Sequence, residues 1–95
     1  MTDQELLELA AKAAQIDHWY GKEGTVDWNP ITDDGDAFRL AVNLRMIIDP
    51  YSGAVAIPPS IVIATVNTGD IYAATRRAIV QVAAEIGKGV QDDER

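Results

Sequence analysis

The sequence contains no cysteine among its 95 residues, and it has one histidine, one phenylalanine and two serines. Without cysteine the chain forms no disulfide and no thiolate zinc site, and it has no cysteine nucleophile. Neither Ser52 nor Ser60 lies in the Gly-x-Ser-x-Gly setting that exposes a catalytic serine. No phosphate-loop or dinucleotide glycine pattern is present. We therefore expect no enzymatic activity and no cofactor, with structural or surface roles for His18 and both serines.

Basic residues are also scarce. The chain has eight Lys and Arg residues and fifteen Asp and Glu residues, which gives it a net charge of −7. Such a charge opposes binding to a nucleic-acid backbone, whose phosphates it repels. No apolar run approaches the roughly 20 residues of a membrane span, and the first residues lack the basic and apolar regions of a secretory signal. We expect a cytoplasmic chain whose partner is neither a membrane nor nucleic acid.

Two amphipathic helices are predicted in the first half of the chain. Thr2 and Glu5 have the spacing of a capping box, and apolar residues recur every three or four positions as far as Ile16, so the first helix should end near residue 17. The acidic segment 32–36 suits the start of a second helix, which runs to about residue 44. The apolar positions of this second helix, Phe38 among them, cover a wide face.

A third helix follows Asp70, the expected N-cap, and carries an apolar stripe that begins at Ile71. Gly87 and Gly89 offer a C-terminal stop for it. Residues 91–95 bury nothing in this interpretation and form a frayed acidic tail. The fold is therefore a single domain of residues 1–90.

Short strands are predicted between the helices. One hairpin covers residues 18–28, a second covers 45–57 around the turn 50–53, and the run 60–66 is the most strand-like of the chain. Pro58 and Pro59 leave open whether the flanking strands are one bent edge or two elements. Apolar residues on both strand faces indicate a sheet covered on both sides.

The order α-β-β-α-β-β(-β)-α therefore predicts an α/β (α+β) fold, a three-layer α/β/α sandwich with a short, largely antiparallel sheet between helices. Three blocks of the sequence, residues 6–14, 28–42 and 72–79, are similar to those of small phage and prophage proteins that carry the phage ABA-sandwich domain. The resemblance implies the same three-layer sandwich and a phage or prophage origin. It implies no activity, because no biochemical function is established for that family as a class.

Two charged motifs are the candidate binding residues. Asp33, Asp34 and Asp36 have the chemistry of a divalent-metal site, but the closing glutamate of a calcium loop is missing, so helix capping is the favoured interpretation. Arg76 and Arg77, next to Tyr72, suit an anion contact. The favoured interpretation is again structural, with one arginine paired to the acidic segment and the other in solvent.

The leading functional hypothesis is a non-catalytic phage accessory protein that binds a host or phage macromolecule, namely a protein, in the cytoplasm of the infected cell. Residues 17–36 carry six acids and one base, so this hypothesis places the contact on an acidic face. The alternative is a small-molecule or nucleotide-binding module that sequesters a defence signal through Tyr72, Arg76 and Arg77. A metal-dependent enzyme is the weakest hypothesis. A homodimer through strand 60–66 is predicted if that strand lies at an edge of the sheet.

Overall fold

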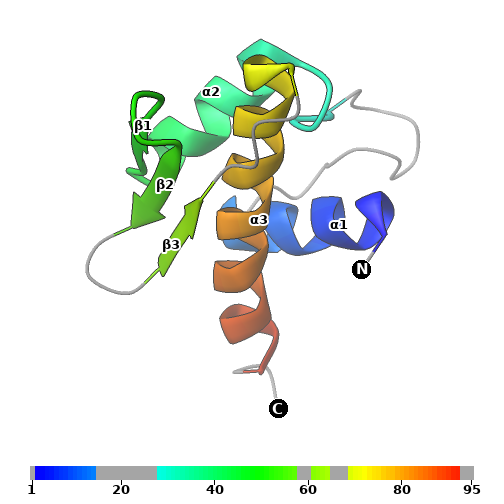
Figure 1. The fold of residues 1–95 in the computed structure, drawn as a ribbon. Helices are drawn as coiled ribbons and strands as arrows, with labels where there is room; N and C mark the ends of the chain where they lie inside the picture. The colour runs from blue at the N-terminus through cyan, green and yellow to red at the C-terminus, as the bar shows by residue number, and fades with distance from the viewer. Residues whose placement is uncertain (1, 15–27, 58–60, 65–68, 93–95) are drawn as a thin grey trace.

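The computed structural model describes residues 2–14, 28–57, 61–64 and 69–92 (Figure 1). The hairpin predicted over residues 18–28 lies outside this part of the chain except for Trp28. The described residues form the elements α1 (Asp3–Ala14), α2 (Asp34–Asn43), β1 (Ile47–Asp49), β2 (Ala54–Ile57), β3 (Ile61–Ala64) and α3 (Ile71–Asp92). None of the described helices is long and apolar enough to cross a membrane.

The three predicted helix starts are confirmed by their capping bonds. The Glu5 amide donates to Thr2 Oγ1 at 3.1 Å, and the Thr2 amide donates to Glu5 Oε1 at 2.8 Å. The backbone amide and then the hydroxyl of Thr2 hold the pKa of Glu5 below its ordinary value. Asp33 caps α2 by accepting from the Asp36 amide at 2.8 Å. Asp70 accepts from the Ala73 amide at 3.1 Å in the first turn of α3.

Within the described residues the sheet has three antiparallel strands in the order β1-β2-β3. Gly53, with φ of 79°, closes the predicted turn between β1 and β2, where a side chain would be strained. The register pairs Val55 with Ile48 on one side and with Ile63 on the other. The strands before and after the two prolines are thus separate neighbours, which settles the question that the sequence left open.

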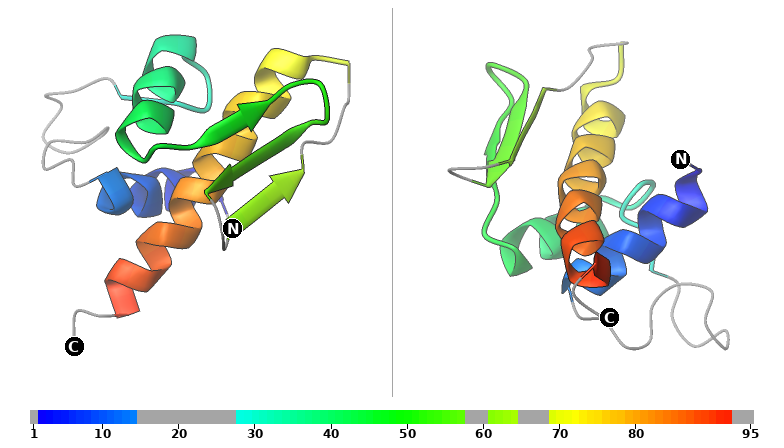
Figure 2. Two further views of the ribbon diagram at one scale, coloured as in Figure 1. Left: turned by 90° about the vertical axis from the view of Figure 1, so that its left-hand side faces the viewer. Right: turned by 90° about the horizontal axis from the view of Figure 1, so that it is seen from below.

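The predicted α/β/α sandwich is wrong. Seen from below, α3 stands between the sheet on one side and α1 on the other, so two helical layers lie on the same face of the sheet (Figure 2). The opposite sheet face is not covered by any described helix, and Ile47 of β1 is 54% exposed. The fold of the described residues is therefore a small α+β arrangement in the order sheet, α3, α1.

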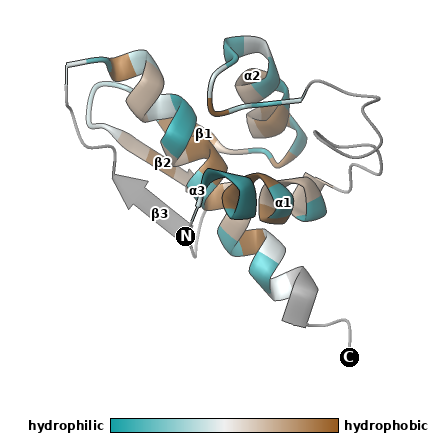
Figure 3. Cartoon of the chain, turned by 90° about the vertical axis from the view of Figure 1, so that its right-hand side faces the viewer, coloured by the Kyte–Doolittle hydropathy of each residue, from teal (hydrophilic) through white to brown (hydrophobic). Residues whose placement is uncertain are grey.

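The physical reason is that α3 is apolar on two sides. Its buried residues include Ala78, Ile79, Val82 and Ala83 of the predicted stripe and, in addition, Val80 and Ala84, which fall outside it, whereas Ile71 at the start of the stripe is 43% exposed. A helix with two apolar sides buries both by lying between two layers. Hydrophilic and hydrophobic bands alternate along α1 (Figure 3), and this helix packs mainly on α3.

The predicted stop at Gly87 and Gly89 is also wrong, because α3 continues through both residues to Asp92. Gly87 is buried against α1: a methyl group added there would overlap the Leu9 carbonyl oxygen and lie 2.7 Å from the Leu9 carbonyl carbon. At Gly89 such a group would meet no atom within 4 Å apart from its chain neighbours and the backbone of its own helix. The first glycine therefore permits the close approach of two helices and does not end one.

The C-terminus of α2 carries a residue in an unfavourable conformation. Met46 donates to the Ala41 carbonyl at 2.9 Å and Arg45 donates to the Val42 carbonyl at 3.1 Å, the bond pair of a Schellman motif. The left-handed position of that motif is normally glycine, but here it is Arg45 with φ of 59°. This turn leads the chain directly from α2 into β1.

Candidate functional site

A pocket of about 390 Å³ opens between α2, the end of β1 and the first turns of α3. Its wall is mostly apolar, with Arg76 and Asp34 at one end. Three of the six candidate residues from the sequence, Asp34, Tyr72 and Arg76, are brought together here. The lining is completed by Ala37, Phe38, Ile48, Pro50, Ile71, Thr75 and Ile79.

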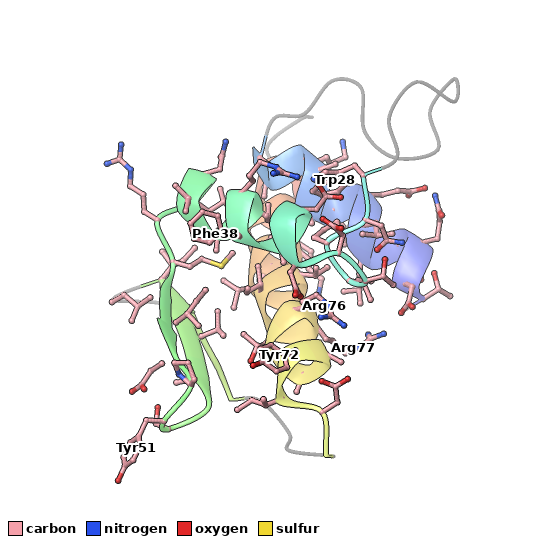
Figure 4. The ribbon with its side chains drawn as sticks, turned by 90° about the horizontal axis from the view of Figure 1, so that it is seen from above. Trp28, Phe38, Tyr51, Tyr72, Arg76 and Arg77 are labelled. Atoms are coloured by element: carbon pink, nitrogen blue, oxygen red, sulfur yellow. The ribbon has the colours of Figure 1, made fainter. Side chains whose placement is uncertain are left out.

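Two aromatic rings line this pocket and remain in contact with solvent. Phe38 of α2 is 67% exposed and Tyr72 of α3 is 70% exposed, and Figure 4 shows them on neighbouring helices. The placement of Phe38 corrects the sequence analysis, which counted it with the buried face of α2. That face is formed by Ala37, Leu40 and Ala41 instead. Exposed aromatic groups around a concave apolar wall are typical of a binding site.

Arg76 lies at the polar end of the pocket and links α3 to α2 and the segment before it. Its Nε donates to the Ile31 carbonyl at 2.8 Å, and its Nη1 lies 2.6 Å from Asp34 Oδ1. The Arg76 side chain is only 19% exposed, whereas that of Asp34 is 75% exposed. The predicted pairing of one arginine with the acidic segment is confirmed.

Arg77 does not join the pocket. Its Nη2 lies 2.8 Å from Asp3 Oδ1 at the start of α1 (Figure 4 shows Arg77 beside Arg76). The expectation that the second arginine has no partner but solvent is therefore wrong. Asp3 is distant in the sequence, so only the packing of α1 on α3 could reveal this pair.

The other two acids of the cluster bind the protein's own backbone. Asp33 caps α2, and Asp36 accepts from the Asn29 amide at 2.9 Å while pairing with Arg39 at 2.7 Å. These contacts match the capping interpretation. No group of three or more His, Cys, Asp or Glu side chains within the described residues is placed to hold a metal ion.

The sequence analysis missed Phe38, Ile71 and Pro50 as site residues. Pro50 was assigned only to a turn and the other two to helix faces. The sequence position of Ile71 could have indicated its exposure. It is the first residue of α3, so little of the helix lies beside its side chain to bury it. No local signal distinguishes Phe38 from the buried residues beside it.

The polar groups of the described lining come from four residues. Tyr72 and Thr75 supply hydroxyl groups, Asp34 a carboxylate and Arg76 a guanidinium. No family model, curated protein or solved structure matches the chain. The resemblance to phage proteins thus stays a prediction that depends on the three sequence blocks.

Proposed function

We propose that the protein is a non-catalytic binding protein that takes an apolar side chain of another protein into the pocket between α2, β1 and α3. The observation that carries this proposal is the exposure of Phe38 and Tyr72 on the wall of one apolar pocket. Transfer of one large apolar side chain from water into such a pocket contributes about 1.5–3 kcal/mol of binding free energy. Two such rings around one cavity provide the anchor of a specific contact.

The biological setting that we propose is that of a phage or prophage accessory protein in the cytoplasm of the infected cell. Its support is the similarity of residues 28–42 and 72–79 to the phage ABA-sandwich proteins. The pocket replaces the acidic face as the proposed point of contact, because Asp33 and Asp36 already accept internal hydrogen bonds.

Selection of displayed random peptides against the folded protein tests the proposal. We expect enriched peptides to share an apolar or aromatic anchor and to shift the backbone NMR signals of α2 and the start of α3. Phe38→Ser combined with Tyr72→Ser should abolish their binding. The matched control is Tyr51→Ser, since Tyr51 is fully exposed at the tip of the β1–β2 turn and does not line the pocket (Figure 4).

Loss of peptide binding in the Tyr51 variant, or its retention in the double variant, would refute the pocket as the binding site. Circular dichroism and urea unfolding of each variant establish that the fold survives. Both substitutions act on exposed side chains, so we expect the free energy of unfolding to change little.

A small-molecule or nucleotide-binding module is the second candidate function. Its support is the pocket volume of about 390 Å³, which falls in the range of small-ligand sites. Arg76 is less suited to an anion than the sequence indicated, because Nε and Nη1 are already bound to Ile31 and Asp34. Calorimetric titration with cyclic and linear nucleotides tests this candidate, and the absence of heat with every nucleotide would reject it.

A further inference from the structure

Strand β1 is an edge strand of the sheet, and it borders the pocket. Among the described residues it pairs only with β2, and no strand lies on its other side. Ile48 of β1 and Pro50 directly after the strand line the pocket. In the left view of Figure 2, β1 is the uppermost strand, and α2 and the first turns of α3 lie beyond its unpaired side. The pocket therefore adjoins an open strand edge.

Both faces of β1 offer an apolar contact to a strand placed beside it. Ile48 is in register with the buried Val55 and lines the pocket, so it marks the sheet face that packs on α3. Because side chains alternate along a strand, Ile47 lies on the opposite face, where it is 54% exposed. A neighbouring strand would place one side chain next to Ile48 and an adjacent one next to Ile47. One extended segment can therefore reach the pocket and Ile47 together.

An open strand edge selects an extended partner. The N–H and C=O groups on the unpaired side of a strand can bond to another extended chain but not to a helix, because a helix bonds its own backbone. β1 has only three residues and is followed by Pro50, which has no N–H, so this edge offers few hydrogen bonds. Side-chain contacts have to supply the rest of the affinity, and the adjoining pocket can provide them.

We infer that the partner is an extended segment of another protein that adds a strand to the open edge of β1. One apolar side chain of this segment, beside Ile48, enters the pocket between Phe38 and Tyr72, and a β-branched neighbour packs on Ile47. This inference rests on the proposed function and specifies the conformation and side-chain pattern of the partner. A second copy of the chain is a poor occupant, because each copy carries a net charge of −7.

Peptides methylated at single backbone nitrogens test the strand pairing. The parent probe is a labelled nine-residue peptide with a central leucine, a valine on each side of it, and threonine and serine beyond. Two derivatives carry one N-methyl group each, at the leucine or at the following valine, and the same pair is made for the most enriched display-selected peptide. Alternate N–H groups of a paired strand face its neighbour. We therefore expect fluorescence anisotropy to show about tenfold weaker binding for one derivative and unchanged binding for the other.

Ile47→Thr tests the contact on the outer face of the sheet. Threonine keeps the β-branched shape of isoleucine, so β1 should survive, and urea unfolding checks that it does. We expect the variant to bind the parent peptide up to about fivefold more weakly. It should bind a peptide whose two valines are replaced by serine as well as the unsubstituted protein does, because both changes remove the same contact. Additive losses would overturn the placement of a partner side chain on Ile47.

Equal weakening by the two N-methyl groups, or no weakening by either, would overturn the inference. Tighter binding of an alanine-rich helical peptide with one leucine, abolished by Phe38→Ser with Tyr72→Ser, would also overturn it while leaving the proposed function intact. A dimer of the protein alone that the same double variant converts to a monomer in sedimentation would show that a second copy fills the site, which overturns the inference too. If no extended, helical or display-selected peptide shows binding that depends on Phe38 and Tyr72, the proposed function fails as well.

Discussion

Gly87→Ala should destabilise the protein although alanine is the better helix former. Gly87 lies where α3 crosses α1, and its missing side chain leaves room for the backbone of Leu9. An added methyl group would lie 2.7 Å from the Leu9 carbonyl carbon and would overlap its oxygen. Backbone atoms cannot rotate away as a side chain can, so the two helices have to separate.

The expected size follows from two opposing effects. Alanine in place of glycine gains about 1 kcal/mol of helix propensity. Overpacking in a filled core costs about 1–3 kcal/mol, and a clash with backbone belongs at the upper end of that range. The net loss is therefore about 2 kcal/mol, which for a domain of this length lowers the Tm by about 8–16 °C.

Gly89→Ala is the matched control, because it makes the same chemical change two residues later in the same helix, where nothing beyond its chain neighbours and the backbone of its own helix lies within 4 Å. It should raise the free energy of unfolding by about 0.5–1 kcal/mol. Urea unfolding followed by circular dichroism measures both variants. A Gly87→Ala protein as stable as the parent, beside a stabilised Gly89→Ala protein, would refute the close approach of α1 and α3.

Three further predictions concern single contacts. Arg45→Gly should stabilise the protein by about 1 kcal/mol in the same assay, because the left-handed position then carries no β-carbon; a destabilised variant would contradict this. Arg76→Ala should lower the free energy of unfolding by about 2 kcal/mol, more than Arg77→Ala does. The first change leaves the Ile31 carbonyl without its donor, whereas the second removes only an exposed ion pair. Equal losses in the two variants would contradict a structural role of the Arg76–Ile31 hydrogen bond. Glu5 has a lowered pKa, so its stabilising contribution is complete above the ordinary glutamate pKa and is lost as pH falls through the lower, folded-state value. Thermal melts over a pH series measure this effect. Glu5→Gln should reduce the fall in Tm at acidic pH, and an unchanged fall would show that other carboxylates cause it.

Local chemistry made most of the described elements predictable. The capping box at Thr2, the caps at Asp33 and Asp70, and the glycine that closes the turn before β2 all act within a few residues, so their signals lie next to one another in the sequence. The pairing of one arginine with the acidic segment was also foreseen, because an aspartate cluster and an arginine pair are natural partners, but only the structure shows that the arginine is Arg76. Tyr72 was also a candidate from the sequence, but Phe38 could not be foreseen as a site residue, since it looks like any core residue of α2.

The sequence by itself determined where the described helices begin and which segments form strands, because capping, turn chemistry and hydrophobic periodicity are local properties of the chain. Only the tertiary structure decided that both helical layers lie on one face of the sheet. That choice depends on which apolar face of α3 meets α1 and which meets the sheet, and α3 has two such faces. Close packing at Gly87 makes α3 the centre of the fold. The same arrangement leaves Phe38 and Tyr72 exposed on the wall of one pocket, which is a property of neighbouring helices and not of either segment alone.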